Sequence, residues 1–304
     1  MTFADFEFEY ELQDSLDAMR FSTPTPVQEQ TIPVIMNGKD IIACAQTGTG
    51  KTAAYLLPTI NRIVREPHKG IDTVVLVPTR ELALQIDQQM EGFGYYVQVS
   101  SVAVYGGNDS AEWNRQKNAI VEGADILIAT PGRLLQHVSM GYVDFSTVRS
   151  VILDEADRML DMGFYDDIMQ VIKQMPVEGR QTHMFSATMP PKIRDMAKAI
   201  LQNPEEVNIA ISKPAEGVKQ GAYVVYEPQK AAVIRNILEG RAEQSIIVFS
   251  TRKQTVKELA RELKRSGYNA DVIHSDLEQK EREEALLKFR NRQTNILVAT
   301  DIIA

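Results

Sequence analysis

The sequence predicts an α/β protein with two domains, each built around a parallel β-sheet. Short runs rich in Val, Ile and Leu alternate with helical stretches over residues 1–208. This alternation is typical of a parallel sheet wrapped by helices. The runs are apolar almost throughout, which suits strands that are covered on both faces. We expect strands at 41–45, 73–77, 97–104, 125–129, 150–154 and 183–186.

The alternation of apolar runs and helical stretches is interrupted once and then resumes. Residues 203–223 contain two prolines and two glycines and have weak periodicity, which predicts a domain boundary. Apolar runs return at 245–250, 270–274 and 295–299, and residues 253–267 read as an amphipathic helix that ends at Gly267. We therefore expect a first domain over 1–208, a linker over 209–217, and a second domain over 218–304 whose sheet is incomplete.

Composition indicates a globular protein. The 304 residues are enough for two domains, and the contents of 44% hydrophobic and 24% charged residues exclude a disordered or collagen-like chain. The first twenty residues lack the basic start and apolar stretch of a secretory signal. No apolar run approaches the roughly 18 residues that span a membrane. Cys44 is the single cysteine, which excludes an intrachain disulfide and agrees with a cytoplasmic location.

The net charge of −8, taken by itself, argues against any binding site for nucleic acid. Affinity for phosphate backbones comes largely from Lys and Arg. Any such site must therefore be a local groove lined by cations and backbone amides.

A phosphate-binding loop is predicted at 45–52, AQTGTGKT, between a strand and a helix. Glycines let backbone N–H groups face phosphate oxygens, and the helix N-terminus adds favourable potential. Lys51 can reach the β/γ-phosphates, and the Thr52 hydroxyl can bind Mg²⁺. Ala45 stands where the general pattern has its first glycine. The alternative is a tight strand-to-helix turn with a solvated lysine.

Two carboxylates follow the strand expected at 150–154. Asp154 and Glu155 lie at its carboxyl end, where ligands bind in open α/β sheets. An aspartate there can hold Mg²⁺, and the adjacent glutamate can orient the attacking water. An acidic helix N-terminus is the alternative. The upstream phosphate loop favours the catalytic interpretation, because phosphoryl transfer needs both parts.

Taken in order, these segments resemble the motif series of the DEAD-box RNA helicases. The resemblance covers essentially the whole chain and implies two RecA-like domains, the second incomplete, that hydrolyse ATP with Mg²⁺ and bind RNA. The matching segments are FSTPTPVQ (21–28), AQTGTGKT (45–52), PTRELALQ (78–85), GG (106–107), TPGRL (130–134), DEAD (154–157), SAT (186–188), IIVFSTRK (246–253), HSDLEQKER (274–282) and ILVATD (296–301).

The resemblance implies a nucleotide site in the first domain. Gln28 would read the adenine edge while Phe3 or Phe21 packs on the ring; a turn before a helix with Phe3 as a core anchor is the alternative. Arg20 stands where the family usually has glycine. The phosphates would be held by Ala45, Gln46, Thr47, Gly48, Thr49, Gly50, Lys51 and Thr52. Mg²⁺ would be held by Thr52 and Asp154, and the catalytic residues would be Lys51, Asp154, Glu155, Ser186 and Thr188.

Ser186 and Thr188 would couple nucleotide state to RNA binding through hydrogen bonds to the DEAD segment, unless their hydroxyls cap the next helix. Gln279 and Arg282 would be further coupling residues. Trp113, His137 and Cys44 match no motif and are assigned to packing.

RNA is the implied partner, bound by its backbone without base recognition. The residues implied for that contact are Pro78, Thr79, Arg80, Gly106, Gly107, Thr130, Pro131, Gly132, Arg133 and Thr300. Taken singly, each also fits an ordinary loop or helix cap.

Two other functions stay open. One is a module that binds ATP or RNA without turnover, and the other is a DNA-unwinding or generic ATPase, which the joint presence of the glutamine element and DEAD disfavours. The segment VATDIIA at 298–304 ends inside what resembles the fifth family motif. We therefore expect residues 1–304 alone neither to unwind RNA nor to show appreciable RNA-stimulated ATPase activity.

Overall fold

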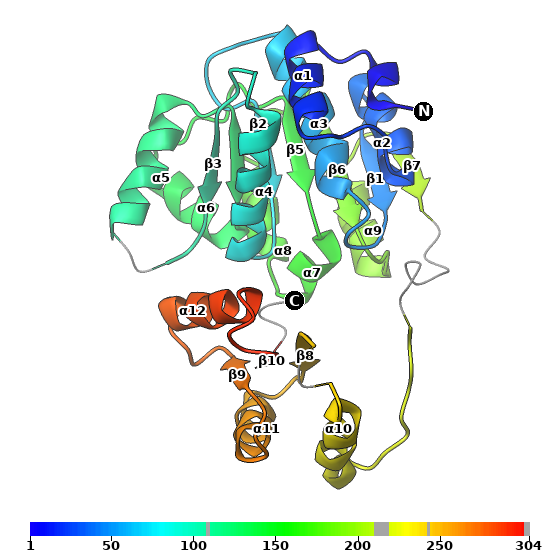
Figure 1. The fold of residues 1–304 in the computed structure, drawn as a ribbon. Helices are drawn as coiled ribbons and strands as arrows, with labels where there is room; N and C mark the ends of the chain where they lie inside the picture. The colour runs from blue at the N-terminus through cyan, green and yellow to red at the C-terminus, as the bar shows by residue number, and fades with distance from the viewer. Residues whose placement is uncertain (108–109, 210–218, 242–243, 301–304) are drawn as a thin grey trace. The chain divides into compact units, whose positions relative to one another are not determined.

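The computed structural model describes residues 1–107, 110–209, 219–241 and 244–300. The chain divides into two compact units, Met1–Ala215 and Glu216–Ala304 (Figure 1). All but one residue of the linker expected at 209–217 lies outside the described part of the chain.

The first unit contains a seven-stranded sheet in the order β3-β4-β2-β5-β6-β1-β7, in which neighbouring strands run parallel. Parallel pairing places the carboxyl ends of the strands at one edge, so Leu76 lies opposite both Ala129 and Leu153. The strands are β1 (Ile41–Cys44), β2 (Thr73–Leu76), β3 (Ser101–Val104), β4 (Ile126–Ala129), β5 (Ser150–Leu153), β6 (Gln181–Ser186) and β7 (Glu205–Asn208).

Helices cover both faces of this sheet (Figure 1). Ile41 and Ala43 of β1 face one core, whereas Ile42 faces the other, as the two-residue period of a strand requires. The first core is covered by η1 (Phe3–Phe6), α1 (Tyr10–Ala18), α2 (Pro26–Met36), α3 (Lys51–Arg65) and α4 (Arg80–Phe93). The second is covered by α5 (Ser110–Glu122), α6 (Pro131–Ser139), α7 (Ala156–Asp161), α8 (Tyr165–Ile172) and α9 (Pro191–Ile200).

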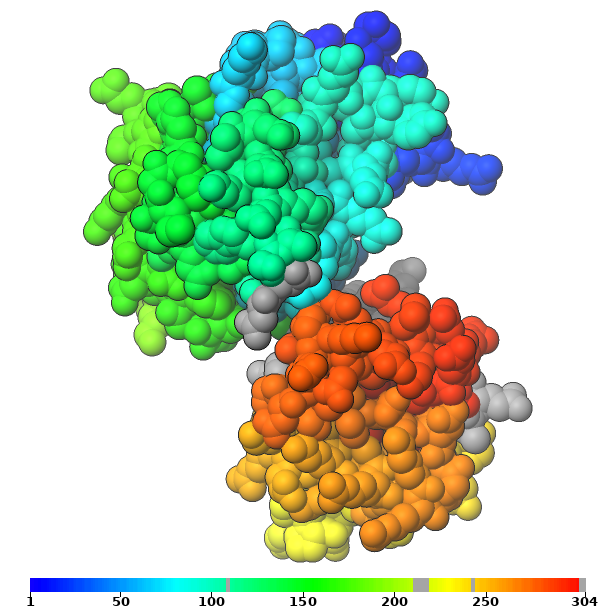
Figure 2. Space-filling view, turned by 90° about the vertical axis from the view of Figure 1, so that its left-hand side faces the viewer, coloured from blue at the N-terminus to red at the C-terminus, as the bar shows by residue number. Residues whose placement is uncertain are grey.

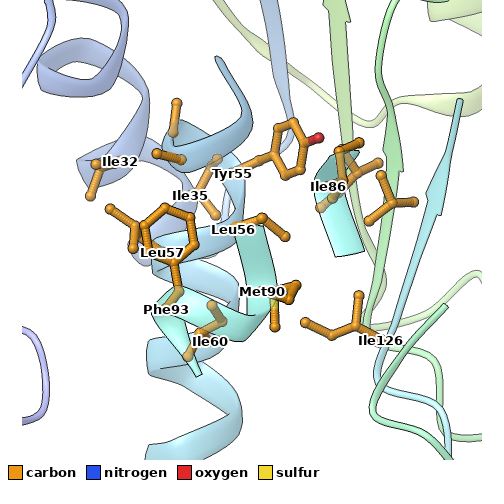
Figure 3. Close-up of a cluster of buried hydrophobic side chains, with 14 of the residues drawn as sticks. Ile32, Ile35, Tyr55, Leu56, Leu57, Ile60, Ile86, Met90, Phe93 and Ile126 are labelled. Atoms are coloured by element: carbon orange, nitrogen blue, oxygen red, sulfur yellow. The ribbon is translucent and has the colours of Figure 1, made fainter. Parts of the chain in front are cut away.

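Large side chains from α2, α3 and α4 fill the first core (Figure 3). Leu56, Leu57 and Ile60 of α3 are fully buried there. Burying each such side chain contributes about 1.5–3 kcal/mol to the free energy of folding, relative to leaving it exposed. In space-filling representation the side chains close the spaces that the ribbons leave within each unit (Figure 2). This packing fixes the position of the sheet and therefore of the edge that carries the candidate site.

The second unit contains a parallel sheet in the order β8-β10-β9. Val256, Leu259 and Leu263 place the apolar face of α11 on this sheet. α11 ends at Arg265, and Gly267 follows with φ +86°, as the expected glycine stop requires. The elements are η2 (Glu227–Gln229), α10 (Lys230–Leu238), β8 (Ile246–Phe249), α11 (Lys253–Arg265), β9 (Ala270–Ile273), α12 (Gln279–Arg290) and β10 (Ile296–Ala299).

The sequence missed one strand. β7 falls within the stretch that was read as a domain boundary, yet it pairs with β1 along its full length. Only Val207 of its four residues is buried. An edge strand with three exposed side chains has no apolar run to reveal it. In the described part of the chain, no helix is long and apolar enough to cross a membrane.

Candidate functional site

The phosphate loop (residues 45–52) joins the carboxyl end of β1 to the start of α3. Its base is fixed to the neighbouring strand, because the N–H of Ala45 donates to the carbonyl of Ser186 over 3.0 Å. Gly48 and Gly50 have φ of +82° and +89°, a left-handed conformation that glycine adopts without strain. Gln46, Thr47 and Gly48 are exposed. The loop therefore presents backbone amides at the sheet edge.

Lys51 is the first residue of α3 and is only 6% exposed. Its Nζ donates to the carbonyl oxygen of Ala45 over 2.9 Å, so the ammonium group lies over the loop. A buried cation that is bonded to a neutral carbonyl is favourable to an anionic ligand. The geometry therefore fits a bound phosphate.

Asp154 follows β5 and is 3% exposed. Its Oδ2 accepts a hydrogen bond from the Tyr55 hydroxyl and its Oδ1 accepts one from the N–H of Glu155, each over 2.9 Å. Burial raises the pKa of Asp154 to about 6, although the charge of Lys51 and the hydrogen bond from Tyr55 oppose the shift. A buried carboxylate with two neutral donors is favourable to a divalent cation.

The donor set also agrees with Mg²⁺. No group of three or more His, Cys, Asp or Glu side chains that could hold a metal occurs among the described residues. Mg²⁺ is usually held by one or two carboxylates together with substrate phosphates and water. Asp154 with the hydroxyl of Thr52 is a set of that kind, beside a loop suited to phosphate.

Glu155 has a left-handed backbone, with φ 52° and ψ 49°, at the start of α7. Such a conformation costs a non-glycine residue roughly 1–2 kcal/mol. Its Oε2 lies 3.3 Å from Nη1 of Arg158. Its side chain is 17% exposed, whereas Asp154 is buried, so two adjacent acids have different surroundings.

Ser186 and Thr188 contact the DEAD segment. Thr188 donates to Oδ2 of Asp157 from both its N–H and its hydroxyl, over 2.9 and 2.7 Å, and the N–H of Asp157 donates to Oγ of Ser186 over 3.3 Å. Burial alone would raise the pKa of Asp157, but the bonds from Thr188 and Ser186 outweigh burial and lower it. α9 begins at Pro191 with Pro190 as its cap, so these hydroxyls do not cap that helix.

Gln28 lies on α2 and is 3% exposed. Its Oε1 accepts from the N–H of Thr25 over 2.8 Å, and its Nε2 donates to the carbonyl of Gly50 over 3.0 Å. Each atom can form one further hydrogen bond. The amide that was expected to read adenine is thus connected to the phosphate loop.

The two aromatic candidates differ in exposure. Phe3 is 1% exposed and packs on Phe6 and Phe21, with ring centroids 5.9 and 5.8 Å apart. Phe21 is half-buried and also meets the edge of Phe93. Phe3 thus occupies a core position, and Phe21 keeps the more accessible ring.

Three segments expected to bind RNA follow adjacent strands. We call them the rim, and they comprise residues 78–80 after β2, 106–107 after β3, and 130–133 after β4. The hydroxyl of Thr79 caps α4 by accepting from the N–H of Leu82 over 3.3 Å. The guanidinium of Arg80 lies 4.6 Å from the ring centroid of Tyr105. Pro78 and Pro131 are buried, whereas Gly106 and Gly107 are exposed.

Some of the residues expected to bind RNA or to couple the two activities belong to the second unit. Thr300 follows β10, is 6% exposed, and donates its N–H to the carbonyl of Ile273 over 3.1 Å. Gln279 and Arg282 lie in the first turn of α12.

Sequence reasoning missed a stack beneath Arg133. The guanidinium of Arg133 lies 4.3 Å from the centroid of Trp113, whose ring stacks on His137 with centroids 4.0 Å apart and planes 13° apart. Gln116 accepts from Nε of Arg133 over 3.3 Å, and the hydroxyl of Tyr142 bonds Nδ1 of His137. Burial first, and the charge of Arg133 second, lower the pKa of His137 to about 4. The ring is therefore neutral near pH 7.

Residues 25–196 match the family model described as "DEAD/DEAH box helicase", and residues 229–304 match the model "Helicase conserved C-terminal domain". The chain belongs to the DEAD/DEAH box helicase family. The resemblance drawn from the motif series is thereby confirmed.

Relatives of this DEAD-box chain are bacterial helicases. It is 40% identical over 303 residues to "ATP-dependent RNA helicase CshA" of Listeria monocytogenes. The matched region covers 99% of this chain and 57% of the Listeria protein. It is 37% identical over 305 residues to "ATP-dependent RNA helicase DeaD" of Escherichia coli, covering 100% of this chain and 48% of the relative. The chain thus spans about half of the length of these curated relatives.

Solved structures agree on the fold. The chain is 27% identical to Saccharomyces cerevisiae Dbp5 bound to RNA and ADP BeF3, with a TM-score of 0.86 over 99% of this chain and 76% of that one. A DEAD box protein from Methanococcus jannaschii is 32% identical, with a TM-score of 0.65 over 100% of this chain and 81% of its own. The expected α/β class with RecA-like parallel-sheet domains is confirmed.

Proposed function

We propose that this DEAD-box protein is an ATP-dependent RNA helicase, which couples hydrolysis of ATP to local separation of RNA strands or remodelling of RNA–protein complexes. One observation carries the proposal. The buried carboxylate of Asp154 lies at the same sheet edge as the phosphate loop, close enough for the charge of Lys51 to lower its pKa. A phosphate cradle and a metal-binding carboxylate are the two parts that phosphoryl transfer requires.

In this proposal the first unit binds ATP. Gln28 contacts the adenine edge, Phe21 or Phe3 packs on the ring, and the amides of the phosphate loop and Lys51 hold the phosphates. Thr52 and Asp154 hold Mg²⁺, which when bound neutralises charge on the phosphate oxygens. Glu155 orients the attacking water, because its carboxylate is more accessible than that of the buried Asp154.

RNA is the proposed partner, and the rim together with Thr300 provides its contacts. Helix N-termini, glycine amides and the guanidinium groups of Arg80 and Arg133 suit sugar–phosphate contacts that ignore base identity. Because only the cations of the rim would contact RNA, RNA binding is compatible with a net charge of −8. The hydrogen bonds that join Asp157 to Ser186 and Thr188 offer a link by which nucleotide state affects RNA affinity. We also propose that the protein acts in the cytoplasm, in keeping with its single cysteine.

The test measures binding and hydrolysis with the same preparation. We expect Mg²⁺·ADP to bind in calorimetric titration, and a labelled single-stranded RNA to bind more tightly than DNA of the same sequence, because the 2′-hydroxyl is available only in RNA. Lys51→Ala should abolish nucleotide binding and should leave RNA binding in place. Failure of the wild-type chain to bind either ligand would overturn the proposal.

Hydrolysis is then compared without nucleic acid, with RNA and with DNA. In a full-length parent, stimulation by RNA above DNA supports the helicase proposal over a DNA-unwinding or generic ATPase. For residues 1–304 alone, the absence of appreciable RNA-stimulated hydrolysis stays a prediction, which the same assay tests in parallel.

A further inference from the structure

Tyr55 places a polar atom in the first core. It lies one helical turn after Lys51 on α3, on the same face of the helix, and is fully buried. Its ring packs on Phe185 with centroids 5.2 Å apart, and Figure 3 shows the ring among aliphatic side chains with the hydroxyl directed toward the strands. The ring fits the core as a phenylalanine would. Packing therefore does not account for the oxygen.

The hydroxyl is accounted for by Asp154. It donates to Oδ2 of that carboxylate over 2.9 Å. Leaving a buried hydroxyl without such a bond would be costly, so the bond also fixes the position of the ring.

Asp154 is held from two sides. The bond from Tyr55 comes from α3, and the bond to Oδ1 comes from the backbone at the start of α7. These two donors fix the plane of the carboxylate. Each carboxylate oxygen has two lone pairs, so a cation can be bound while both hydrogen bonds are kept.

We propose that Tyr55 is a positioning residue, whose hydroxyl holds the carboxylate of Asp154 in the orientation that receives the Mg²⁺ accompanying the nucleotide. The inference rests on the proposed function, because it takes Asp154 as a ligand of that ion. Tyr55 acts by holding proposed metal ligands: its hydroxyl donates to Asp154 and also interacts with the hydroxyl of Thr52. Groups that orient metal ligands in this way typically change metal affinity about 10–100-fold when removed.

The test is Tyr55→Phe, which removes one oxygen atom and keeps the ring. ADP affinity is measured by calorimetry in EDTA and at a series of Mg²⁺ concentrations. We expect the affinity in EDTA to be unchanged. The Mg²⁺ concentration that gives half of the maximal tightening should rise about 10–100-fold. Tyr142→Phe is the matched control, since it removes a hydroxyl bonded to His137 elsewhere in the same unit, and its Mg²⁺ dependence should equal that of the wild type.

The outcomes are separable. If the wild type shows no Mg²⁺-dependent tightening, the proposed role of Asp154 fails. If the wild type tightens and Tyr55→Phe tightens at the same Mg²⁺ concentration, only the present inference is overturned. An equal loss of ADP affinity with and without Mg²⁺ would assign Tyr55 to packing alone and would also overturn it.

Thermal unfolding of each variant without ligand verifies that the fold is retained.

Discussion

The side-chain amide of Gln28 donates to the carbonyl oxygen of Gly50 over 3.0 Å and so connects α2 to the phosphate loop. A side chain at position 50 would displace the amide of Gln28, because a Cβ there would lie 2.5 Å from Nε2 of Gln28. The φ of +89° independently favours glycine. The close approach therefore depends on the residue types at both positions.

This relationship predicts selectivity for adenine. The remaining donor and acceptor of the Gln28 amide match the N6–H and N7 of adenine, whereas guanine presents O6 at that edge. We expect ADP to bind more tightly than GDP. Gln28→Ala should weaken ADP binding by about 1–2 kcal/mol, the loss of one or two hydrogen bonds, and should change GDP binding less. Calorimetric titration of both nucleotides checks this, and equal affinities in the wild type would contradict it.

Substitutions of Asp154 and Glu155 should have different effects. Asp154→Ala removes the buried carboxylate and should abolish the Mg²⁺-dependent part of ADP binding. Glu155→Gln keeps a side chain of the same shape and should leave that binding intact. In any form of the protein that hydrolyses ATP, the same change should lower turnover by about 10²–10⁴-fold, because the carboxylate no longer polarises water. Normal turnover by Glu155→Gln would show that the role given to Glu155 is wrong.

Local signals account for what the sequence predicted. The buried runs of β1 and β5 are apolar throughout, so the strands and the chemistry at their carboxyl ends could be located. β7 was missed because only Val207 faces the core. The contacts between Tyr55 and Asp154 and between Trp113 and Arg133 join different elements at no regular spacing, so they emerge only from packing.

The stack beneath Arg133 predicts a graded loss of RNA affinity. Arg133→Ala removes a charge from the rim, so it should weaken RNA binding and reduce the salt dependence by about 0.7, as one lost phosphate contact does for a single strand. Trp113→Leu keeps the charge and loses the cation–π contact that positions the guanidinium, so it should weaken RNA binding less than Arg133→Ala does, with the salt dependence unchanged. Titrations with RNA at several salt concentrations measure both. Equal salt dependence in Arg133→Ala and the wild type would exclude a phosphate contact at Arg133.

The turn at Arg20 predicts a stabilising substitution. Arg20 has φ +60° just after α1, and the N–H of Phe21 donates to the carbonyl of Leu16, which closes the helix end. This is the position at which the family usually has glycine. Arg20→Gly should therefore raise the free energy of unfolding by up to about 1 kcal/mol, since glycine adopts this φ without steric cost. Denaturant unfolding measures the change, and Arg20→Ala, which keeps a Cβ, is the control that should bring no such gain.

His183 predicts a stability change whose size depends on pH. It lies on β6 between β1 and β5, is fully buried, and neither ring nitrogen has a hydrogen-bond partner among the described residues. Burial first, and the charge of Arg62 second, lower its pKa to about 3. His183→Leu removes a buried polar ring of similar size and should stabilise the protein by about 1 kcal/mol at pH 7.

The gain should grow in acid. Below the unfolded pKa of about 6.5, the unfolded chain takes up a proton at residue 183 that the folded chain takes up only near pH 3. The wild type therefore loses stability as the pH falls through this window, by up to about 1.4 kcal/mol per pH unit, and the leucine variant does not. Other titrating groups, including Asp154 with its opposite shift, cancel in the difference between the two proteins. Denaturant unfolding at pH 7, 6 and 5 measures that difference, and a constant value would contradict the burial of a neutral His183. His137→Leu is the matched control and should be destabilising, because His137 is bonded to Tyr142 and stacked on Trp113.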